Sequence, residues 1–369
     1  MTGDWYRIAD EAEVASPALL LHPARVAENV RRMIVLAGDA ARLRPHVKTH
    51  KLPQIVRLLG SLGVRKVKTA TIAESEMAAD AGAADVLLAY PPVGPAVERV
   101  VALARSRPEV RWRTIADAPA AVVALGRAAA AAGITLDVLV DLDLGMHRTG
   151  IPCGPAAAAL YAEIAATPGL AAAGLHAYDG HLRDPDPARL AAAADAAFAP
   201  VERLRADLEA AGLPVPLVVA GGTPTFAAHA RRPDVELGAG TMLLWDTGET
   251  VKNPTLDFLP AAVLLTRVVS RPGPDLLCLD LGYKAVASEM PPPRVRIFGL
   301  EDAAFVGHSE EHLVVSTPRA DDFPVGTVLY AVPWHICPTV ALQAEVVVVE
   351  GGRAVDRWPV VARARRLTV

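Results

Sequence analysis

The chain has 369 residues, of which 52% are hydrophobic and 21% charged, and its formal net charge at pH 7 is −4. This length suits two domains rather than one, and the composition is typical of a well-packed globular protein, not of a disordered one. The mixed charge, with few aromatic residues and no basic run, excludes the surface expected of a nucleic-acid-binding protein.

The sequence also limits where the protein works. No apolar stretch reaches about 18 to 20 uncharged residues, so we expect no membrane-spanning helix. The segment Met1–Asp10 carries acids and a tryptophan and lacks the pattern of a secretory signal peptide. Three cysteines form a sparse, odd-numbered set, which predicts a reducing, cytoplasmic location. Cys153 and Cys278 are read as small buried residues, and only Cys337 is singled out.

From about Leu19 to Leu244, short apolar runs alternate with alanine-rich helical stretches, the first of which begins at Pro23. The expected strands are 43–49, 66–70, 85–90, 111–115, 136–141, 170–177, 217–220 and 235–238. The later expected helices are 52–62, 73–81, 96–105, 118–132, 155–166, 187–211 and 224–229. Strands joined by crossover helices build a parallel sheet, and about eight such repeats favour a closed (β/α)8 TIM-type barrel over an open doubly wound sheet.

The pattern changes after residue 254, where short β-branched runs are separated by turns such as Arg271–Pro274. The expected strands here are 263–269, 276–279, 295–298, 312–316, 327–332 and 344–349. Such runs are typical of an antiparallel β domain. We therefore predict an α/β barrel over residues 14–247 and a C-terminal antiparallel β domain made of residues 1–13 and 248–369, with Trp5–Ile8 as a possible added strand.

In such barrels the active site lies at the C-terminal ends of the strands, so the residues after each expected strand are candidates. The first strand leads into Arg44–Lys51, in which Lys48 lies between two histidines. A lysine held at a strand end and partly desolvated can lose its proton and form a Schiff base with an aldehyde. Lys51 competes with it but lies toward the following helix, so Lys48 is favoured; a solvated surface lysine is the alternative.

Titratable side chains follow the fifth and sixth expected strands. Arg148 could reach inward as a permanent cation, and a surface arginine is the alternative. His176, Tyr178 and His181 lie within six residues, a density of acid–base groups that suits proton transfer, with a buried structural histidine as the alternative. Strand alternation places His176 and Tyr178 on one face.

Glycine and threonine follow the last two expected strands, in the turns 221–225 and 238–241. Exposed backbone N–H groups and hydroxyls suit a phosphate, and barrels often bind phosphate at this position. A lysine that captures an aldehyde, together with a phosphate cradle, indicates pyridoxal 5′-phosphate.

A second motif lies near the C-terminus, where His335 and Cys337 are two residues apart. On an extended strand this spacing points an imidazole and a sulfur to the same face. Such a pair can supply two ligands to a zinc-like metal. The sequence therefore predicts an aldehyde cofactor that works beside a metal.

These segments resemble the D-threonine aldolase and D-serine dehydratase family, a branch of the alanine-racemase-like, fold type III pyridoxal-phosphate enzymes. The resemblance covers essentially the whole chain and is carried by the segments RPHVKTHK, DLGMHRTG, HAYDGH, GGTPT, GAGT and HICPT. The lysine segment and the metal motif are specific in combination, whereas the glycine turns are not.

The resemblance implies a role for each matching residue. These are cofactor attachment by Lys48, Arg148 toward the pyridine nitrogen, Tyr178 near the cofactor, His181 near substrate and metal, phosphate contacts by Gly222, Thr223, Gly240 and Thr241, and a divalent metal (Zn, Mn or Mg) on His335 and Cys337. It also implies a homodimer with shared active sites, in which the second domain of one subunit covers the barrel mouth of the other.

The activity implied is that of a D-threonine aldolase-type lyase, which cleaves D-β-hydroxy-α-amino acids to glycine and an aldehyde. Family aldolases can use a carboxylate where dehydratases use His-x-Cys, so Cys337 keeps a D-serine dehydratase-type activity open as the alternative. An amino-acid racemase is less favoured because it needs no metal. A non-catalytic pyridoxal-phosphate-binding protein is less favoured because it resembles a lone barrel.

Overall fold

The computed structural model describes residues 4–368, and the contacts between Cα atoms divide the chain into two compact units. The barrel unit contains Arg31–Lys48, Val56–Gly240 and the chain from residue 364 on. The β unit contains the chain up to residue 30, Thr49–Ile55 and Thr241–Arg363. None of the described helices is long and apolar enough to cross a membrane.

The barrel unit is built on a parallel sheet with the strand order β2-β3-β4-β5-β7-β8-β9, and β6 pairs with β5. The strands are β2 (Lys66–Thr69), β3 (Asp85–Leu88), β4 (Arg111–Ala116), β5 (Leu136–Asp143), β6 (Ile151–Pro152), β7 (Leu170–Tyr178), β8 (Val218–Ala220) and β9 (Val235–Leu237). Residues 43–46 close the sheet, because Leu43 bridges Leu237 on one side and His46 bridges Lys68 on the other. The predicted closed barrel is confirmed, and the open doubly wound sheet is wrong.

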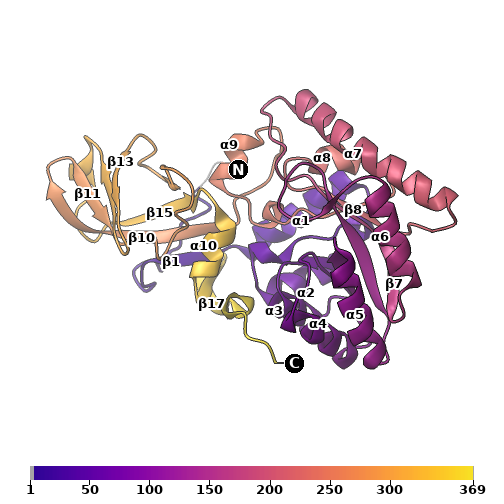
Figure 1. Cartoon of the computed structure of the whole chain (residues 1–369). Helices are drawn as coiled ribbons and strands as arrows, with labels where there is room; N and C mark the ends of the chain where they lie inside the picture. The colour runs from indigo at the N-terminus through magenta and orange to yellow at the C-terminus, as the bar shows by residue number, and fades with distance from the viewer. Residues whose placement is uncertain (1–3, 369) are drawn as a thin grey trace. The chain divides into compact units, whose positions relative to one another are not determined.

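Helices follow the strands and begin where the sequence predicts. They are α3 (Ile72–Asp80), α4 (Pro95–Ser106), α5 (Pro119–Ala131), α6 (Pro155–Ala166), α7 (Pro187–Ala210) and α8 (Phe226–Ala230), with the short 3-10 helix η1 (Ala40–Arg42). Helices α1 (Pro23–Ala37) and α2 (Pro53–Ser61) and the 3-10 helices η2 (Val47–Thr49) and η5 (Val361–Ala364) each have residues in both units. Proline opens many of these helices, since its fixed φ suits the first turn. Helices α5 and α6 run alongside β7 (Figure 1).

A buried ion network lies inside the barrel near the beginnings of the strands. The fully buried guanidinium of Arg44 contacts Asp85 Oδ1 at 2.6 Å and Glu236 Oε2 at 2.7 Å, and Arg113 contacts Asp85 at 3.1 Å. Buried charges are tolerated when they are paired in this way. An apolar cluster shares the interior and consists of Leu87, Ile115, Leu139, Ala173, Leu217 and Val219.

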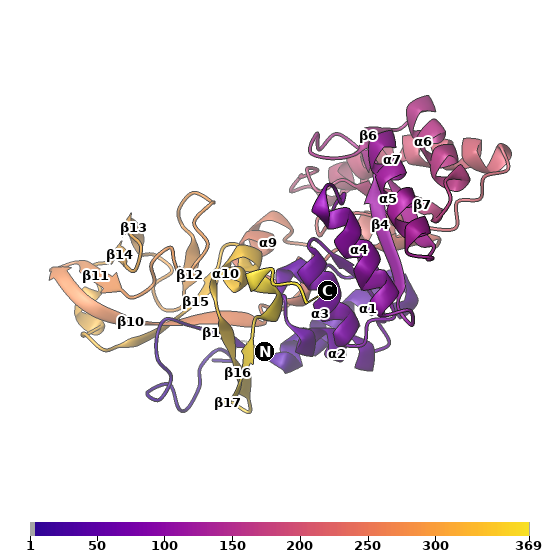
Figure 2. The same cartoon turned by 60° about the horizontal axis from the view of Figure 1, so that its bottom comes forward.

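The β unit is a mostly antiparallel sheet with the order β13-β14-β11-β10-β1-β16-β17, in which β15 pairs with both β10 and β12. The strands are β1 (Ala18–Leu21), β10 (Ala262–Gly273), β11 (Leu276–Leu279), β12 (Val295–Ile297), β13 (Ala304–His308), β14 (Leu313–Ser316), β15 (Val328–Pro333), β16 (Glu345–Glu350) and β17 (Arg353–Pro359). The helices are α9 (Thr247–Lys252), α10 (Ile336–Leu342), η3 (Thr241–Leu243) and η4 (Ala320–Asp322). Figure 2 shows β10 as the long strand that joins the β11 end of this sheet to the β1 end.

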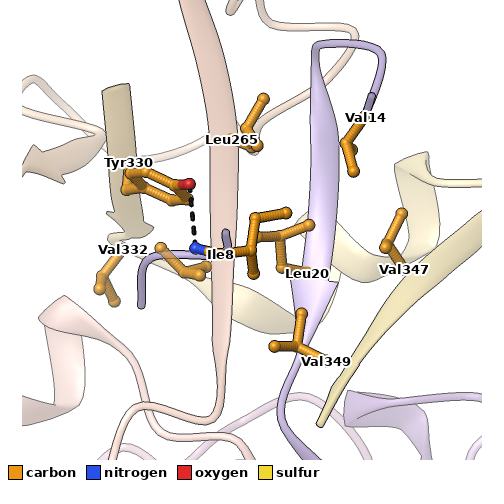
Figure 3. Close-up of a cluster of buried hydrophobic side chains, with 9 residues drawn as sticks. Ile8, Val14, Leu20, Leu265, Tyr330, Val332, Val347 and Val349 are labelled. Atoms are coloured by element: carbon orange, nitrogen blue, oxygen red, sulfur yellow. Dashed lines mark hydrogen bonds between the residues drawn. The ribbon is translucent and has the colours of Figure 1, made fainter. Parts of the chain in front are cut away.

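The core of the β unit forms where the N-terminal segment meets the sheet (Figure 3). The side chains of Ile8 and Val14 pack against Leu20, Leu265 and their neighbours from the central strands. The N–H of Ile8 donates to the hydroxyl of Tyr330 at 3.3 Å. The beginning of the chain is therefore held by apolar burial and by a hydrogen bond to a buried phenol.

The N-terminal part of the chain differs from expectation. Trp5–Ile8 forms turns rather than the expected strand, and the strand that joins the β sheet is Ala18–Leu21. That strand lies within the range 14–247 expected for the barrel, but it pairs with β10 and β16 of the β unit. Its apolar sequence suits either sheet, so only the long-range pairing assigns it.

Candidate functional site

Lys48 lies at the C-terminal end of the segment that closes the barrel. It is the central residue of η2, so it stands in a 3-10 turn rather than in the extended run expected over residues 43–49. The backbone N–H of Lys48 donates to His46 Nδ1 at 3.3 Å, which holds this turn. Lys51 belongs to the β unit and has a φ of 55°. Of the two lysines, Lys48 is the one in the barrel unit.

Tyr178, the last residue of β7, has a cation on its ring from two directions. The guanidinium carbon of Arg148 lies 5.2 Å from the ring centroid and Lys68 Nζ lies 5.5 Å from it. Arg148 is exposed at the surface of the chain, yet it lines the same pocket as Tyr178. A Cβ atom at residue 180 would lie 1.9 Å from the Tyr178 hydroxyl, so the ring requires glycine there.

The loop that carries Arg148 is shaped by the residue that ends β5. Asp143 Oδ1 accepts hydrogen bonds from the N–H groups of Gly145 at 2.9 Å and His147 at 3.0 Å. Gly150 closes the loop with a φ of 100°, and a Cβ there would lie 2.6 Å from the Asp143 nitrogen. Glycine is therefore required at the end of the DLGMHRTG segment.

His176 and Asp141 form a buried pair that lines this pocket. His176 Nδ1 lies 2.7 Å from Asp141 Oδ1, whereas His176 Nε2 and Asp141 Oδ2 have no hydrogen-bond partner among residues 4–368. Burial lowers the pKa of His176, against the effect of Asp141. The imidazole therefore has one nitrogen fixed and the other open to a ligand.

Asp179 ties together two segments that were read separately in the sequence. Its Oδ1 accepts a hydrogen bond from the Thr225 hydroxyl at 2.7 Å, and its Oδ2 lies 2.7 Å from His229 Nε2. Thr225 Oγ in turn accepts from the N–H of Gly222 at 3.2 Å. The side chains of Asp179, Thr225 and His229 are all buried. Burial opposes the charge of Asp179, but the hydrogen bond to His229 lowers its pKa below the usual range.

His181 lies near the loop that follows β5. Its Nε2 is 3.1 Å from the position that a Cβ at Gly145 would take, and its Nδ1 is buried without a hydrogen-bond partner. An open imidazole nitrogen suits a proton acceptor. The structure therefore places His181 next to the loop that carries Arg148.

The predicted phosphate contacts are divided between the units. Gly222, Thr223 and Gly240 belong to the barrel unit, where Thr223 is buried and a Cβ at Gly222 would lie 3.3 Å from the Tyr178 ring. Thr241 belongs to the β unit, and its hydroxyl lies 3.6 Å from Cys337 Sγ. The glycine turn after β8 is thus next to Tyr178.

The metal motif lies at the beginning of a helix and not on the strand that the sequence predicts. Strand β15 ends at Pro333, His335 is the N-cap of α10, and Cys337 lies in its first turn. Asp246 fixes this turn, because its Oδ2 accepts from the N–H of Ile336 at 2.9 Å. The two motif side chains remain neighbours, since His335 hydrogen-bonds to Cys337.

The donors of the motif have further partners in the β unit. His335 Nδ1 contacts Glu289 Oε1, and Cys337 Sγ donates to Thr49 Oγ at 3.3 Å. Burial opposes the positive charge of His335, but its hydrogen bonds to Cys337 and Glu289 raise the pKa of this imidazole to about 9. A carboxylate on one ring nitrogen is the usual way to orient a metal-binding histidine. Within residues 4–368, no group of three or more His, Cys, Asp or Glu side chains is arranged to hold a metal.

The chain is similar in sequence to proteins of a known family. Residues 21–244 match the family described as alanine racemase, N-terminal domain, and residues 261–349 match a serine dehydratase domain family. The D-threonine aldolase of Arthrobacter sp is 31% identical over 95% of this chain and 93% of its own length. The chain belongs to the D-threonine aldolase and D-serine dehydratase family. As a member it is an enzyme with the alanine-racemase-like fold.

Further relatives agree with this assignment. The 3-hydroxy-D-aspartate aldolase of Paracoccus denitrificans (strain Pd 1222) is 30% identical over 96% of this chain and 94% of its own length. The crystal structure of D-threonine aldolase from Filomicrobium marinum superposes with a TM-score of 0.88 at 29% identity and covers 96% of this chain and 98% of that one. The likeness to this family therefore extends over both units.

Several residues at this family site are not found by sequence reasoning. Asp179 and Thr225 lie inside the HAYDGH and GGTPT segments, but their bonds to each other and to His229 join residues about 50 positions apart. Glu289 lies in a loop with no motif. Lys68 could have been found, because it stands two residues after Lys66 on a barrel strand and alternation puts both on one face.

Proposed function

We propose that the protein is a pyridoxal-phosphate- and divalent-metal-dependent lyase of the D-threonine aldolase type, which converts D-β-hydroxy-α-amino acids to glycine and an aldehyde. The observation that carries this proposal is the His335–Cys337 pair, whose imidazole contacts Glu289, in a chain whose barrel unit carries Lys48. A metal-free racemase does not require a pair of metal ligands such as His335 and Cys337.

The barrel unit fits pyridoxal phosphate. The barrel unit offers this group the unpaired Nε2 of His176 and Oδ2 of Asp141. It also offers the Tyr178 ring, which two cations contact, and the glycine turn after β8. Lys48 would attach the aldehyde carbon, and Gly222, Thr223, Gly240 and Thr241 would hold the phosphate. When bound, this group joins the substrate amine and delocalises the negative charge that develops at Cα.

The donor set of the β unit fits a divalent metal of the zinc kind. A neutral imidazole nitrogen and a cysteine sulfur are the ligands that borderline-soft metals prefer, and the open positions leave room for the substrate oxygen. A metal there would polarise the β-hydroxyl. Because His335 must lose its proton to bind, and its pKa is raised to about 9, metal binding is expected to strengthen as the pH rises.

The chain's own residues then divide the work. Tyr178 and Arg148 orient the bound ring, and Arg148 presents a fixed positive charge to it. His181 accepts the proton of the β-hydroxyl at its open Nδ1 as the Cα–Cβ bond breaks and the aldehyde leaves. A proton returned to Cα gives glycine, which balances the reaction.

A D-serine dehydratase-type activity is the second candidate, favoured by Cys337 and by the match of residues 261–349 to a serine dehydratase domain family. In that reaction Lys48 takes the α-proton and the β-hydroxyl leaves as water, and hydrolysis of the resulting imine by one water gives an oxoacid and ammonia. The deciding experiment incubates the purified protein with D-threonine and with D-serine, each with and without added Zn²⁺, Mn²⁺ or Mg²⁺. Glycine and acetaldehyde from D-threonine support the aldolase, oxoacid and ammonia support the dehydratase, and full activity after chelation refutes the metal-dependent proposal.

We further propose a homodimer whose active sites combine the barrel of one subunit with the metal pair of its partner. Mixing inactive Lys48→Ala and His335→Ala proteins tests this. Shared sites restore roughly a quarter of the wild-type activity, because half of the dimers are mixed and each holds one intact site. Sites built within one subunit restore none.

A further inference from the structure

Lys68, the third residue of β2, carries a buried cation that no nearby group neutralises. The residue is 2% exposed. Among the described residues, its ammonium makes no hydrogen bond or ion pair with another side chain, and the centroid of the Tyr178 ring lies 5.5 Å from it. Lys66, two residues earlier on the same strand, forms an ion pair with Glu236. The two lysines share a face of β2 but have opposite surroundings.

The ammonium of Lys68 lies where the predicted ligand-binding turns begin. A Cβ atom at Gly238 would lie 2.3 Å from Lys68 Nζ and 3.4 Å from the carbonyl oxygen of Gly221. Gly238 and Gly221 are the first residues after β9 and β8. With Tyr178 at the end of β7, Lys68 Nζ is therefore surrounded by the C-terminal ends of three neighbouring strands.

A positive charge on Lys68 is unfavourable in this buried position, and the surroundings of the ammonium shift its pKa accordingly. Burial, together with the positive charge of Lys48, lowers the pKa of Lys68 to about 7, and Asp141 and Asp179 oppose the shift from a distance. A group in the core without a partner destabilises the protein unless a ligand completes it. Strongly perturbed groups in a cleft are candidates for such a role.

We propose that Lys68 is a cofactor-binding residue whose ammonium pairs with an anionic oxygen of bound pyridoxal phosphate, either of the phosphate ester or of the ring phenolate. The inference rests on the proposed function. It adds a residue on β2 to a site otherwise built from Lys48 and the loops after β5, β7, β8 and β9. Both candidate oxygens are anionic, and the strand ends that surround Lys68 belong to the predicted phosphate turns and to Tyr178.

Pairing with an anion also keeps the two lysines of the site distinct. A neutral amine beside the aldehyde could compete with Lys48 for it. An anionic oxygen holds Lys68 in its charged form, which is not a nucleophile. The same pairing removes the unfavourable burial of an isolated charge.

The test uses ligands without an aldehyde, so that Lys48 chemistry does not enter. Calorimetric titration of the cofactor-free protein with pyridoxine 5′-phosphate gives its affinity at pH 7. Lys68→Met is expected to weaken binding by about tenfold to a hundredfold, the effect of losing a hydrogen bond to a charged group. The matched control, Lys66→Met, removes a lysine from the same face of the same strand and is expected to leave the affinity within about twofold.

Two simpler probes identify the oxygen. If Lys68 binds the phosphate, Lys68→Met weakens inorganic phosphate binding and leaves pyridoxine binding unchanged. If it binds the phenolate, the variant weakens pyridoxine binding and leaves inorganic phosphate unchanged. Either pattern supports the inference.

Proton uptake gives a readout that a merely structural role would not move. Because burial lowers the pKa of Lys68 in the free protein and an anionic partner would raise it, binding at pH 8 should take up protons in the wild type. The uptake is seen as a dependence of the binding enthalpy on the buffer. Lys68→Met and Lys68→Gln should both lose this uptake. Folded Lys68→Met and Lys68→Gln proteins that bind pyridoxine 5′-phosphate as tightly as the wild type, with the same uptake, would overturn the inference. A wild-type protein that does not bind this ligand at all would instead overturn the proposed cofactor.

Discussion

Two buried cations of the same barrel, Arg44 and Lys68, have opposite surroundings: Arg44 is paired with carboxylates and Lys68 is not. Arg44 is fully buried and contacts the carboxylates of Asp85 and Glu236 at 2.6 and 2.7 Å. Burial opposes its charge, but these partners raise the pKa of Arg44. Lys68 is 2% exposed and has no such partner, and burial lowers its pKa to about 7.

The difference follows the direction of the strands. Near their beginnings, the charges of Arg44, Asp85 and Glu236 neutralise one another, although Arg44 Nη2 keeps no partner of its own. Near their C-terminal ends, His176 Nε2 and Asp141 Oδ2 have no partner either, and Lys68 joins them. One end of the barrel uses buried charge for stability, and the other keeps polar groups available for a ligand. This is the arrangement expected of (β/α)8 enzymes.

The largest expected effect is the loss of the ion network. Arg44→Met removes the buried cation that Asp85 and Glu236 share and should lower the free energy of unfolding by up to about 3–5 kcal/mol. Arg113 and Lys66 remain as the partners of these two carboxylates. Denaturant unfolding of the cofactor-free protein measures the loss. Arg111→Met is the control, because it removes an exposed arginine from a pair with Asp137 at 2.7 Å and should cost no more than about 1 kcal/mol. Equal losses in both variants would contradict a structural role for the network.

The opposite sign is expected at Lys68. Lys68→Met should raise the stability of the cofactor-free protein at pH 7 by about 1–4 kcal/mol, because it removes a buried charge without a partner. The pKa of this lysine is lowered from 10.5 to about 7 by burial and Lys48, against Asp141 and Asp179. The gain should therefore be fullest below pH 7 and disappear as the pH rises toward 10.5, where the lysine is neutral in both states. A variant less stable than the wild type at pH 7 would break the comparison with Arg44.

A smaller effect is expected at Glu289 in the β unit, which orients a ligand without binding the metal itself. Glu289→Gln should weaken metal binding by about 10–100-fold, since His335 would lose the carboxylate on its Nδ1. Competition with a chromophoric chelator measures the affinity. Glu310→Gln, which removes an exposed carboxylate paired with Lys284, should change nothing. An unchanged affinity in Glu289→Gln would show that His335 needs no orienting partner.

The sequence predicts most of the fold because each element carries a local signal. Apolar runs and alanine-rich helices alternate through the barrel, and β-branched runs such as Leu276–Leu279 mark the β unit. Strand Ala18–Leu21 lies in the range predicted for the barrel but pairs with β10 and β16 of the β unit. An apolar sequence alone does not specify which strands it pairs with. Strand β17 has no clear apolar run, because three of its seven residues are charged and its hydrophobic residues do not alternate regularly.

The site is predicted less completely for the same physical reason. Lys48 and His335 lie in recognisable segments, but both stand in helical turns where extended structure was expected. The sequence does not predict helix α10, because Pro338 and the alternation of His335 with Cys337 are both typical of extended chain. The surroundings of Lys68, by contrast, consist of residues from strands far apart in the sequence, and only the closed barrel brings them together.

The measurement that tests the central claim most directly is the covalent labelling of the barrel. The protein is loaded with pyridoxal phosphate, reduced with borohydride and digested, and the labelled peptide is sequenced by mass spectrometry. The account predicts a visible absorption band before reduction and a single label on Lys48, with Lys51 and Lys68 unmodified. A label on Lys51 or Lys68, or no band at all, would contradict the assignment of Lys48 as the residue that attaches the cofactor.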